Sequence, residues 1–219
     1  MRCAVLFSGG KDSSLALHVM ASRGCSICSL VAFSNCAKDG LFHSLDMRFV
    51  EKAAESLCLP LRVFRLSGKK QAELLEVQEA FSQLERDYGI RGLITGDTTP
   101  ASNLHQLEAL CQVLGIQLIA PLLGTKKEAI LANALQSGFT VVPVRVTAES
   151  ESMELLGVEL DSESLVSGVV AHGYSESVLG AMVLDAPFFS KRIRVSESQQ
   201  VWTSLQGLMV FNSVELEEK

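Results

Sequence analysis

The residues with the clearest chemical potential form one short run near the start of the chain, Ser8-Gly9-Gly10-Lys11-Asp12-Ser13. Two adjacent glycines let the backbone turn tightly and approach an anion, because no Cβ stands in the way. The amides that follow, at the N-terminus of an expected helix, favour a bound phosphate. Ser8 and Ser13 add hydroxyl groups, and Lys11 adds a mobile positive charge for phosphate oxygens. The run is therefore interpreted as a phosphate-binding loop.

Two carboxylates indicate a metal ion beside this loop. A carboxylate next to a phosphate site is repulsive unless it caps the helix or holds a cation, so Asp12 indicates Mg²⁺. Asp97 follows an apolar strand and Gly96, at the carboxyl edge where ligands gather in open parallel sheets. We interpret Asp97 as a second carboxylate on the magnesium or pyrophosphate side, with a helix cap for the segment beginning at Thr98 as the alternative.

The chain that positions these residues alternates between strand and helix patterns. Apolar runs predict strands at 3–7, 27–33, 61–66, 92–95 and 117–120, and helical spacing predicts helices at 15–24, 45–58, 71–88 and 103–114. This alternation predicts βαβ units and an α/β fold, an open doubly wound parallel sheet with helices on both faces. The loop directly follows the first strand and directly precedes the first helix.

The pattern changes after Pro121, and we place a soft domain boundary between 1–124 and 125–219. A helix is expected at 126–137, a strand at 139–146 and two short helical stretches within 150–167. Antiparallel strands are expected at 181–184, 191–196 and 202–214. The second region is therefore a smaller α+β unit.

Composition narrows the class of protein. The chain has 219 residues, is 47% hydrophobic and 20% charged, and carries a formal net charge of −6. It has ample apolar material for a core, and no apolar run approaches the length that crosses a bilayer. The acidic balance argues against direct nucleic-acid binding. The opening residues, Met1–Phe7, are interpreted as a buried strand rather than a signal peptide, so we expect a cytoplasmic protein.

Six cysteines are scattered along the chain, and only Cys25 and Cys28 have a C-x-x-C spacing. No second pair completes a zinc site. Two interpretations remain open: small buried side chains in a reducing compartment, or a redox or sulfur-carrying role.

The loop is neither a Walker A motif nor a Gly-x-Gly-x-x-Gly dinucleotide fingerprint. Ser-Gly-Gly-x-Asp-Ser after the first strand resembles the PP-loop of the N-type ATP pyrophosphatases. The resemblance implies a Rossmann-like nucleotide-binding fold of the adenine nucleotide alpha hydrolase type, cleavage of ATP between its α and β phosphates, and transfer of AMP to a substrate oxygen. Lys11, Asp12 and Asp97 would then support catalysis, with ATP and Mg²⁺ as cofactors.

Further segments are similar to the diphthine–ammonia ligase branch of this superfamily. They are Leu41-Phe42-His43, Leu66–Glu73, Gly92–Asp97, Val113–Leu122 and Val183–Phe189, so the similarity spans nearly the whole chain. Three segments depart from the branch: Gly173–Ala181 lacks most of its polar residues, Gln106–Ala109 lacks an Arg, and Leu123 replaces a Trp. These departures fall in the expected acceptor pocket.

The resemblance also implies roles for single residues. Phe33 and Ser34 would border the adenine, with plain core as the alternative for Phe33. His43 would contact the nucleotide or shuttle protons, with a loop histidine that has no role in the site as the alternative, and Gly96 would border the nucleotide. Glu176 and Asp185 are the candidates for the acceptor site.

The leading functional hypothesis is a ligase that adenylates a carboxylate and forms an amide with free ammonium. By resemblance, the acceptor is the diphthine side chain of translation elongation factor 2, and a homodimer is a candidate assembly. Two alternatives remain: a tRNA-thiolating or related nucleotide-modifying enzyme, and a nucleotide-binding module without catalysis.

Overall fold

The computed structural model describes residues 1–37, 41–42, 46–100, 102–148, 153–166 and 178–219. The chain forms two units. The first comprises Met1–Ser8, Asp12–Ala54 and Leu59–Gly124, and the second comprises Gly9–Lys11, Glu55–Cys58 and Thr125–Lys219. The middle of the glycine-rich loop therefore groups with the second unit.

The first unit is built on a parallel sheet. Among the described residues its five strands are β1 (Arg2–Leu6), β2 (Ser26–Ser34), β3 (Leu61–Arg65), β4 (Gly92–Ile94) and β5 (Gln117–Ile119), in the order β3-β2-β1-β4-β5. All four neighbouring pairs are parallel. The central strand β1 is an apolar run whose last four residues are buried, as expected for a strand covered on both faces.

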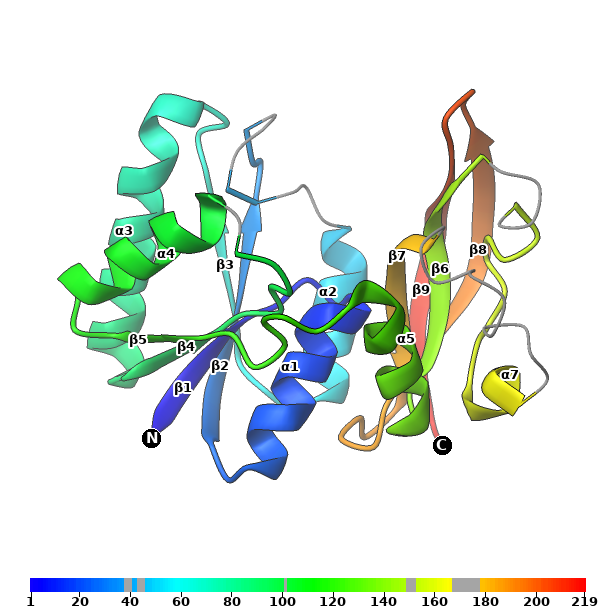
Figure 1. The fold of residues 1–219 in the computed structure, drawn as a ribbon, viewed down its shortest axis with the longest axis horizontal. Helices are drawn as coiled ribbons and strands as arrows, with labels where there is room; N and C mark the ends of the chain where they lie inside the picture. The colour runs from blue at the N-terminus through cyan, green and yellow to red at the C-terminus, as the bar shows by residue number, and fades with distance from the viewer. Residues whose placement is uncertain (38–40, 43–45, 101, 149–152, 167–177) are drawn as a thin grey trace. The chain divides into compact units, whose positions relative to one another are not determined.

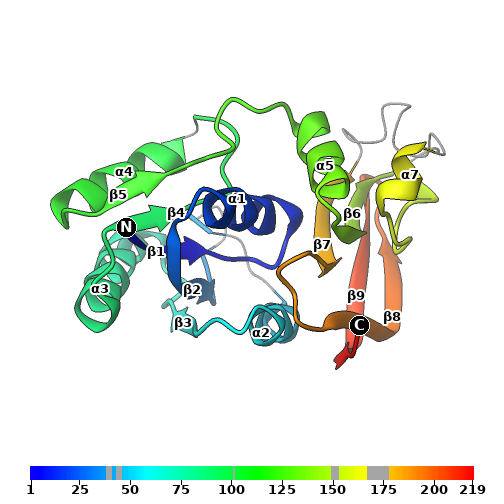
Figure 2. The same ribbon diagram turned by 90° about the horizontal axis from the view of Figure 1, so that it is seen from below.

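Helices cover both faces of this sheet (Figures 1 and 2). Helices α1 (Lys11–Ser22) and α2 (Met47–Ser56) lie on one face, and α3 (Lys70–Tyr88) and α4 (Ser102–Val113) lie on the other. Helix α3 buries Val77, Phe81 and Leu84. It ends at Gly89, whose φ of 59° is a left-handed conformation that glycine adopts without strain. The expected open doubly wound α/β fold is confirmed.

The strand order fixes where a ligand can bind. From β1 the chain moves outward to β2 and β3 on one side, and β4 and β5 occupy the other side. The connections that leave the carboxyl ends of β1 and β4 therefore diverge to opposite faces of the sheet. This switch point opens a crevice between them, and ligands of open α/β sheets bind at such a crevice.

The second unit contains an antiparallel sheet. Its described strands, in spatial order, are β7 (Val178–Asp185), β6 (Thr140–Thr147), β9 (Gln206–Glu217) and β8 (Arg192–Trp202), accompanied by α5 (Lys127–Gln136) and α7 (Ser162–Val166). The expected smaller α+β region is confirmed. Among the described residues, no helix is both long and apolar enough to cross a bilayer.

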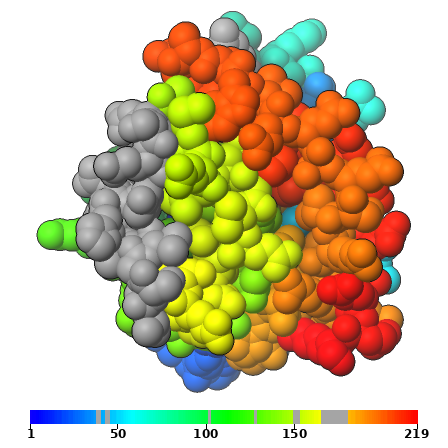
Figure 3. All heavy atoms as spheres, turned by 90° about the vertical axis from the view of Figure 1, so that its right-hand side faces the viewer, coloured from blue at the N-terminus to red at the C-terminus, as the bar shows by residue number. Residues whose placement is uncertain are grey.

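One boundary expected in this unit is wrong. The sequence predicted strands at 191–196 and 202–214, but β8 continues through Trp202 and the hairpin turn falls at Thr203–Leu205. The turn is held by the Thr203 hydroxyl, which accepts the amide of Gln206 at 3.1 Å. The polar run after Val195 resembled a loop because β8 lies at the sheet edge, where most of its side chains are exposed (Figure 3).

Candidate functional site

The loop after β1 is closed by its own serines. The Ser8 amide donates to the Ser13 hydroxyl at 3.2 Å, and the two hydroxyl oxygens lie 3.0 Å apart. Gly9 has a φ of 71°, so the turn uses the freedom that only glycine offers without strain. Helix α1 begins immediately afterwards, at Lys11. The loop therefore has the strand–turn–helix form of an anion-binding site.

The middle of the loop pairs with strand β7. The Val183 amide donates to the Gly9 carbonyl at 3.1 Å, and Gly10 forms an isolated antiparallel bridge with Met182. These contacts engage the backbone of Gly9 and Gly10 and therefore restrain the conformation of the loop. The sequence gave no sign of this pairing, because the partners lie more than 170 positions apart.

The end of β4 packs directly on the backbone of the loop. A Cβ placed on Gly96 would lie 2.7 Å from the carbonyl carbon of Asp12 and 2.7 Å from the Ser13 nitrogen. Contacts of this length do not occur in folded proteins, so only glycine fits at this position. Next to it, the hydroxyl of the buried Thr95 donates to the Asp97 carboxylate, which fixes the orientation of that carboxylate.

A cavity of about 320 Å³ lies in the first unit, beyond the carboxyl ends of β1, β2 and β4. This volume is within the range of about 300–1,000 Å³ that small-molecule sites occupy. The lining residues are Leu6, Phe7, Ser8, Asp12, Ser13, Val31, Ala32, Phe33, Leu41, Phe42, Thr95, Gly96, Asp97, Asn103 and Leu107. The cavity joins a polar part, with the two aspartates and the serines, to an apolar part that includes Phe33 and Phe42.

The apolar part is an aromatic cluster. The rings of Phe33 and Phe42 stack with centroids 4.3 Å apart and planes 16° apart. Phe64 and Phe81 pack around Phe33 at 5.9 and 6.2 Å. Phe33 is buried and belongs to the core as well as to the cavity wall, so both interpretations of this residue describe part of its environment.

The predicted site residues divide into three groups. The cavity lining brings together Ser8, Asp12, Ser13, Phe33, Gly96 and Asp97. Gly9, Gly10, Lys11, Ser34 and Asp185 are described but are not part of that lining. His43 and Glu176 lie outside the described residues.

Asp185, at the end of β7, is already engaged. Its Oδ1 pairs with the ammonium of Lys219 at 2.6 Å and accepts the amide of Ala186 at 2.8 Å. The Lys219 ammonium also donates to the Ala186 carbonyl at 2.9 Å. In this structure Asp185 therefore orders the segment that follows β7.

Sequence reasoning missed four parts of the cavity and its support: Phe42, Thr95, Asn103 and Glu73. Phe42, Thr95 and Glu73 lay within segments noted for their resemblance to a family, but no role was assigned to them. Asn103, at the start of α4, gave no signal of its own.

The comparison with protein families covers both units. Residues 1–118 match the N-terminal domain of diphthamide synthase, and residues 126–216 match its C-terminal domain. The chain belongs to the diphthamide synthase family. The resemblance inferred from the sequence is thereby confirmed, and the chain is a PP-loop enzyme that uses ATP.

The other comparisons add little to this assignment. No curated protein matches the chain. Among solved structures, the chain is similar to a predicted subunit of tRNA methyltransferase from Methanocaldococcus jannaschii, with 20% identity and a TM-score of 0.49. That similarity covers 85% of this chain and 98% of the other.

The cavity of this diphthamide synthase family member suits ATP with magnesium. Because Gly96 has no side chain, the end of β4 can pack directly on the backbone of the loop. Asp12 and Asp97 supply carboxylate oxygens to the cavity, and Mg²⁺ prefers such ligands. Mg²⁺ in nucleotide sites is commonly held by one or two carboxylates together with phosphate oxygens and water. Within the described part of the chain, no three His, Cys, Asp or Glu side chains form a metal-binding group.

Neither Cys25 nor Cys28 of this family member is part of the cavity lining. Cys28 is near the start of β2, where its thiol donates to the Cys3 carbonyl at 3.3 Å. Val31, the first residue of β2 in the cavity lining, follows three residues later, so the two are roughly 10 Å apart at the rise of a strand. This placement at the amino edge of the sheet argues against a sulfur-carrying role of Cys28 in the cavity.

Burial also makes two of the thiols poor nucleophiles. Desolvation, with a smaller effect of Cys25, raises the pKa of Cys3 to about 11. Desolvation, with a smaller effect of Glu108, raises the pKa of Cys111 to about 12. At pH 8 about one Cys3 thiol in a thousand would be ionised, and the thiolate is the reactive form.

We therefore expect iodoacetamide at pH 8 to modify the exposed Cys58 in the native protein and to spare Cys3 and Cys111. Peptide mapping by mass spectrometry after a timed reaction would measure this. The same reaction in guanidinium chloride is the control, because all six thiols should then react at similar rates. Native modification of Cys3 as fast as Cys58 would contradict the burial described here.

Proposed function

We propose that this protein is an ATP-dependent ligase that joins ammonia to a carboxylate. The observation that carries the proposal is the cavity at the switch point of the sheet. There the glycine-rich loop, Asp12 and Asp97 border the same space as the aromatic wall. In this proposal the phosphate half of ATP lies against the loop and its nucleoside half lies against the aromatic wall. The match to both domains of the diphthamide synthase family supports the choice of reaction.

The first step is adenylation of the acceptor. A carboxylate oxygen attacks the α phosphorus of ATP, the bond from that phosphorus to the bridging oxygen breaks, and pyrophosphate leaves with its charge. The Ser8 and Ser13 hydroxyls, the amides at the start of α1 and the Lys11 ammonium are the groups that would bind the departing phosphates. Mg²⁺ held by Asp12 and Asp97 would neutralise the charge that grows on them.

The second step forms the amide. Ammonia attacks the acyl carbon, the bond from that carbon to the AMP oxygen breaks, and AMP leaves with one oxygen of the original carboxylate. The nitrogen releases a proton to solvent. Free ammonium is the proposed source of the nitrogen, and it loses one further proton to solvent to give the ammonia that attacks.

The acceptor in this proposal is the carboxylate of diphthine on translation elongation factor 2, and residues 125–219 form the region that binds it. Asp185 contributes by ordering the segment after β7, through its bonds to Lys219 and Ala186. Glu176 remains a candidate acceptor contact.

The proposal is tested by following the oxygen atoms of the acceptor carboxylate with an isotope label. Purified protein would be incubated with ATP, magnesium, ammonium and elongation factor 2 bearing diphthine whose carboxylate is labelled with ¹⁸O. We expect one ¹⁸O in each AMP released, together with pyrophosphate and an amide on the factor. Lys11→Ala should lower AMP formation about 10²-fold, whereas Lys69→Ala, a change of an exposed lysine, should leave it unaltered.

The same assay separates the alternatives. AMP formed without ¹⁸O would exclude transfer to this carboxylate. ATP that is bound but never cleaved, with this acceptor and with a panel of other carboxylates, would favour a nucleotide-binding module and overturn the ligase.

A further inference from the structure

A buried carboxylate on α3 has one hydrogen bond within the described part of the chain and no obvious role in the core. Glu73 lies in the first turn of α3, with 3% of its surface exposed. Its Oε2 accepts the amide of Leu41 at 3.0 Å. Its Oε1 is also buried and has no hydrogen-bond partner among the described residues.

This arrangement is costly for the fold. Burying a carboxylate removes its hydration, and a single amide does not replace it. The N-terminal end of α3 lowers that cost, because the helix dipole favours a negative charge there. An apolar side chain would still pack at this position at lower cost. The contact with Leu41 is therefore the feature of Glu73 that calls for an explanation.

Leu41 is held from two helices. Glu73 of α3 binds its amide, and the side-chain amide of Asn103 in α4 donates to its carbonyl over 3.5 Å, a long and weak bond. Both polar main-chain groups of one residue thus have side-chain partners, and the shorter of the two bonds is to Glu73. Leu41 and Asn103 both line the cavity. The two helices cover the same face of the sheet (Figure 1).

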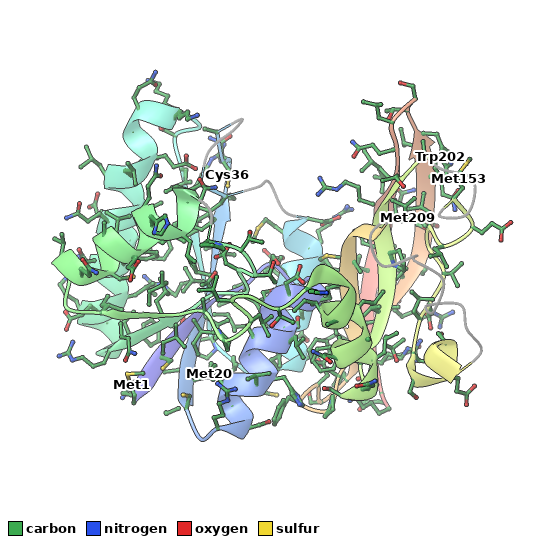
Figure 4. All side chains as sticks on the ribbon, in the orientation of Figure 1. Met1, Met20, Cys36, Met153, Trp202 and Met209 are labelled. Carbon is green, nitrogen blue, oxygen red and sulfur yellow. The ribbon has the colours of Figure 1, made fainter. Side chains whose placement is uncertain are left out.

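The residue next to Leu41 is part of the aromatic cluster. Phe42 follows directly and stacks on Phe33, which is anchored at the end of β2 in the core. Cys36, labelled in Figure 4, lies just beyond the same strand, and its thiol donates to the Phe33 carbonyl at 3.6 Å. Phe33 is therefore fixed by β2 itself, whereas Phe42 lies outside any helix or strand and directly follows the residue that Glu73 and Asn103 bind.

We propose that Glu73 is a positioning residue for the nucleoside half of the nucleotide. It does not line the cavity. By holding Leu41 it keeps Phe42 stacked on Phe33, and the pair forms the apolar wall against which the nucleoside packs. The inference rests on the proposed function only in taking ATP as the occupant of this cavity. It does not depend on the acceptor or on ammonia.

Direct binding measurements test this without any turnover. Dissociation constants for AMP, for pyrophosphate and for ATP in EDTA would be measured by titration calorimetry. Glu73→Leu should weaken AMP and ATP binding about tenfold, the effect of losing one hydrogen bond to a charged group. Pyrophosphate binding should be unchanged, because the phosphate loop is untouched.

Two variants control for charge and for helix α3. Glu73→Gln should bind AMP within about twofold of the wild type, because the amide oxygen of Gln can still accept the Leu41 amide. Glu76→Leu is the matched change: Glu76 lies on the same helix and accepts the amide of Ser67, which is not part of the cavity lining. It should leave all three ligands unaffected.

A double-mutant cycle separates positioning from general destabilisation. Phe42→Ala should weaken AMP binding by itself, and Glu73→Leu should add nothing further in that background, since Glu73 acts through Phe42. Additive effects, equal loss of pyrophosphate binding, or a Glu73→Gln variant as weak as Glu73→Leu would each overturn the inference.

The binding measurements also distinguish the role of Glu73 from the proposed binding of ATP. If wild-type protein binds AMP and Glu73→Leu binds it as tightly, the role of Glu73 is wrong while ATP binding stands. If the wild type binds none of the three ligands, ATP is not the occupant of this cavity and both proposals fail.

Discussion

Replacing Gly96 with alanine should lower the rate of AMP formation about 10²-fold, although the change adds one methyl group and alters no charge. The new Cβ would lie 2.7 Å from two backbone atoms of Asp12 and Ser13 and 2.9 Å from the Asp12 carbonyl oxygen. A flexible side chain could move out of the way, but the first turn of α1 cannot. The loop must therefore shift relative to β4, and a displacement of about 1 Å from the productive geometry costs roughly this much in rate.

The comparison needs a glycine where the same change is tolerated. At Gly180 in β7 a new Cβ would find its nearest atoms at 3.7 and 3.8 Å, which is ordinary contact, and its φ is not in the left-handed region. Gly180→Ala should keep its affinity for pyrophosphate, because it lies in the expected acceptor region and leaves β4 and the start of α1 unchanged. Steady-state rates and pyrophosphate dissociation constants of both variants, with thermal unfolding to show that each is folded, would measure the difference. A folded Gly96→Ala variant that binds pyrophosphate normally would show that the close packing on the loop is not needed.

The parallel sheet could be predicted because its strands carry their own signal. Buried strands such as β1 and β2 are short, continuous apolar runs, and the helices between them have a regular apolar face. Strand β8 lacks that signal. The residues Ser196–Gln200 of β8 are polar, because the strand lies at an edge of the sheet where its side chains face solvent. Such a polar edge strand cannot be distinguished from a loop by its composition.

The residues of the candidate site also differ in whether the local sequence could indicate their role. The glycine-rich loop, Gly96 and Asp97 could be predicted because each follows a recognisable strand, and parallel strands bring their carboxyl ends to one edge. Glu73 and Asn103 could not be assigned, because their role depends on contacts with Leu41 across 32 and 62 positions. Hydrogen bonds between such distant segments leave no periodic pattern in the sequence. The same holds for the bond between Gly9 and Val183.

Replacing Asp97 with asparagine should lower the rate of AMP formation by about 10²- to 10³-fold and raise the concentration of magnesium needed for half-maximal rate. Asparagine keeps an oxygen that can accept the hydrogen bond of the Thr95 hydroxyl, so the change removes the charge with little change in local structure. Thr95→Val is the complementary control, since it removes that hydrogen bond and leaves the charge. It should have the smaller effect on the magnesium dependence.

The two readings of Asp97 differ in what this experiment measures. If Asp97 holds a magnesium ion beside the departing pyrophosphate, the loss of charge weakens only ligands that carry the metal, so AMP binding in EDTA should stay normal. If Asp97 instead caps the segment that begins at Thr98, asparagine is an equally good cap, and both the rate and the magnesium dependence should remain those of the wild type. A rate profile over magnesium concentration for the wild type, Asp97→Asn and Thr95→Val therefore decides between a catalytic carboxylate and a structural one. It does so without knowledge of the acceptor's binding site, because the cavity lies wholly within the first unit.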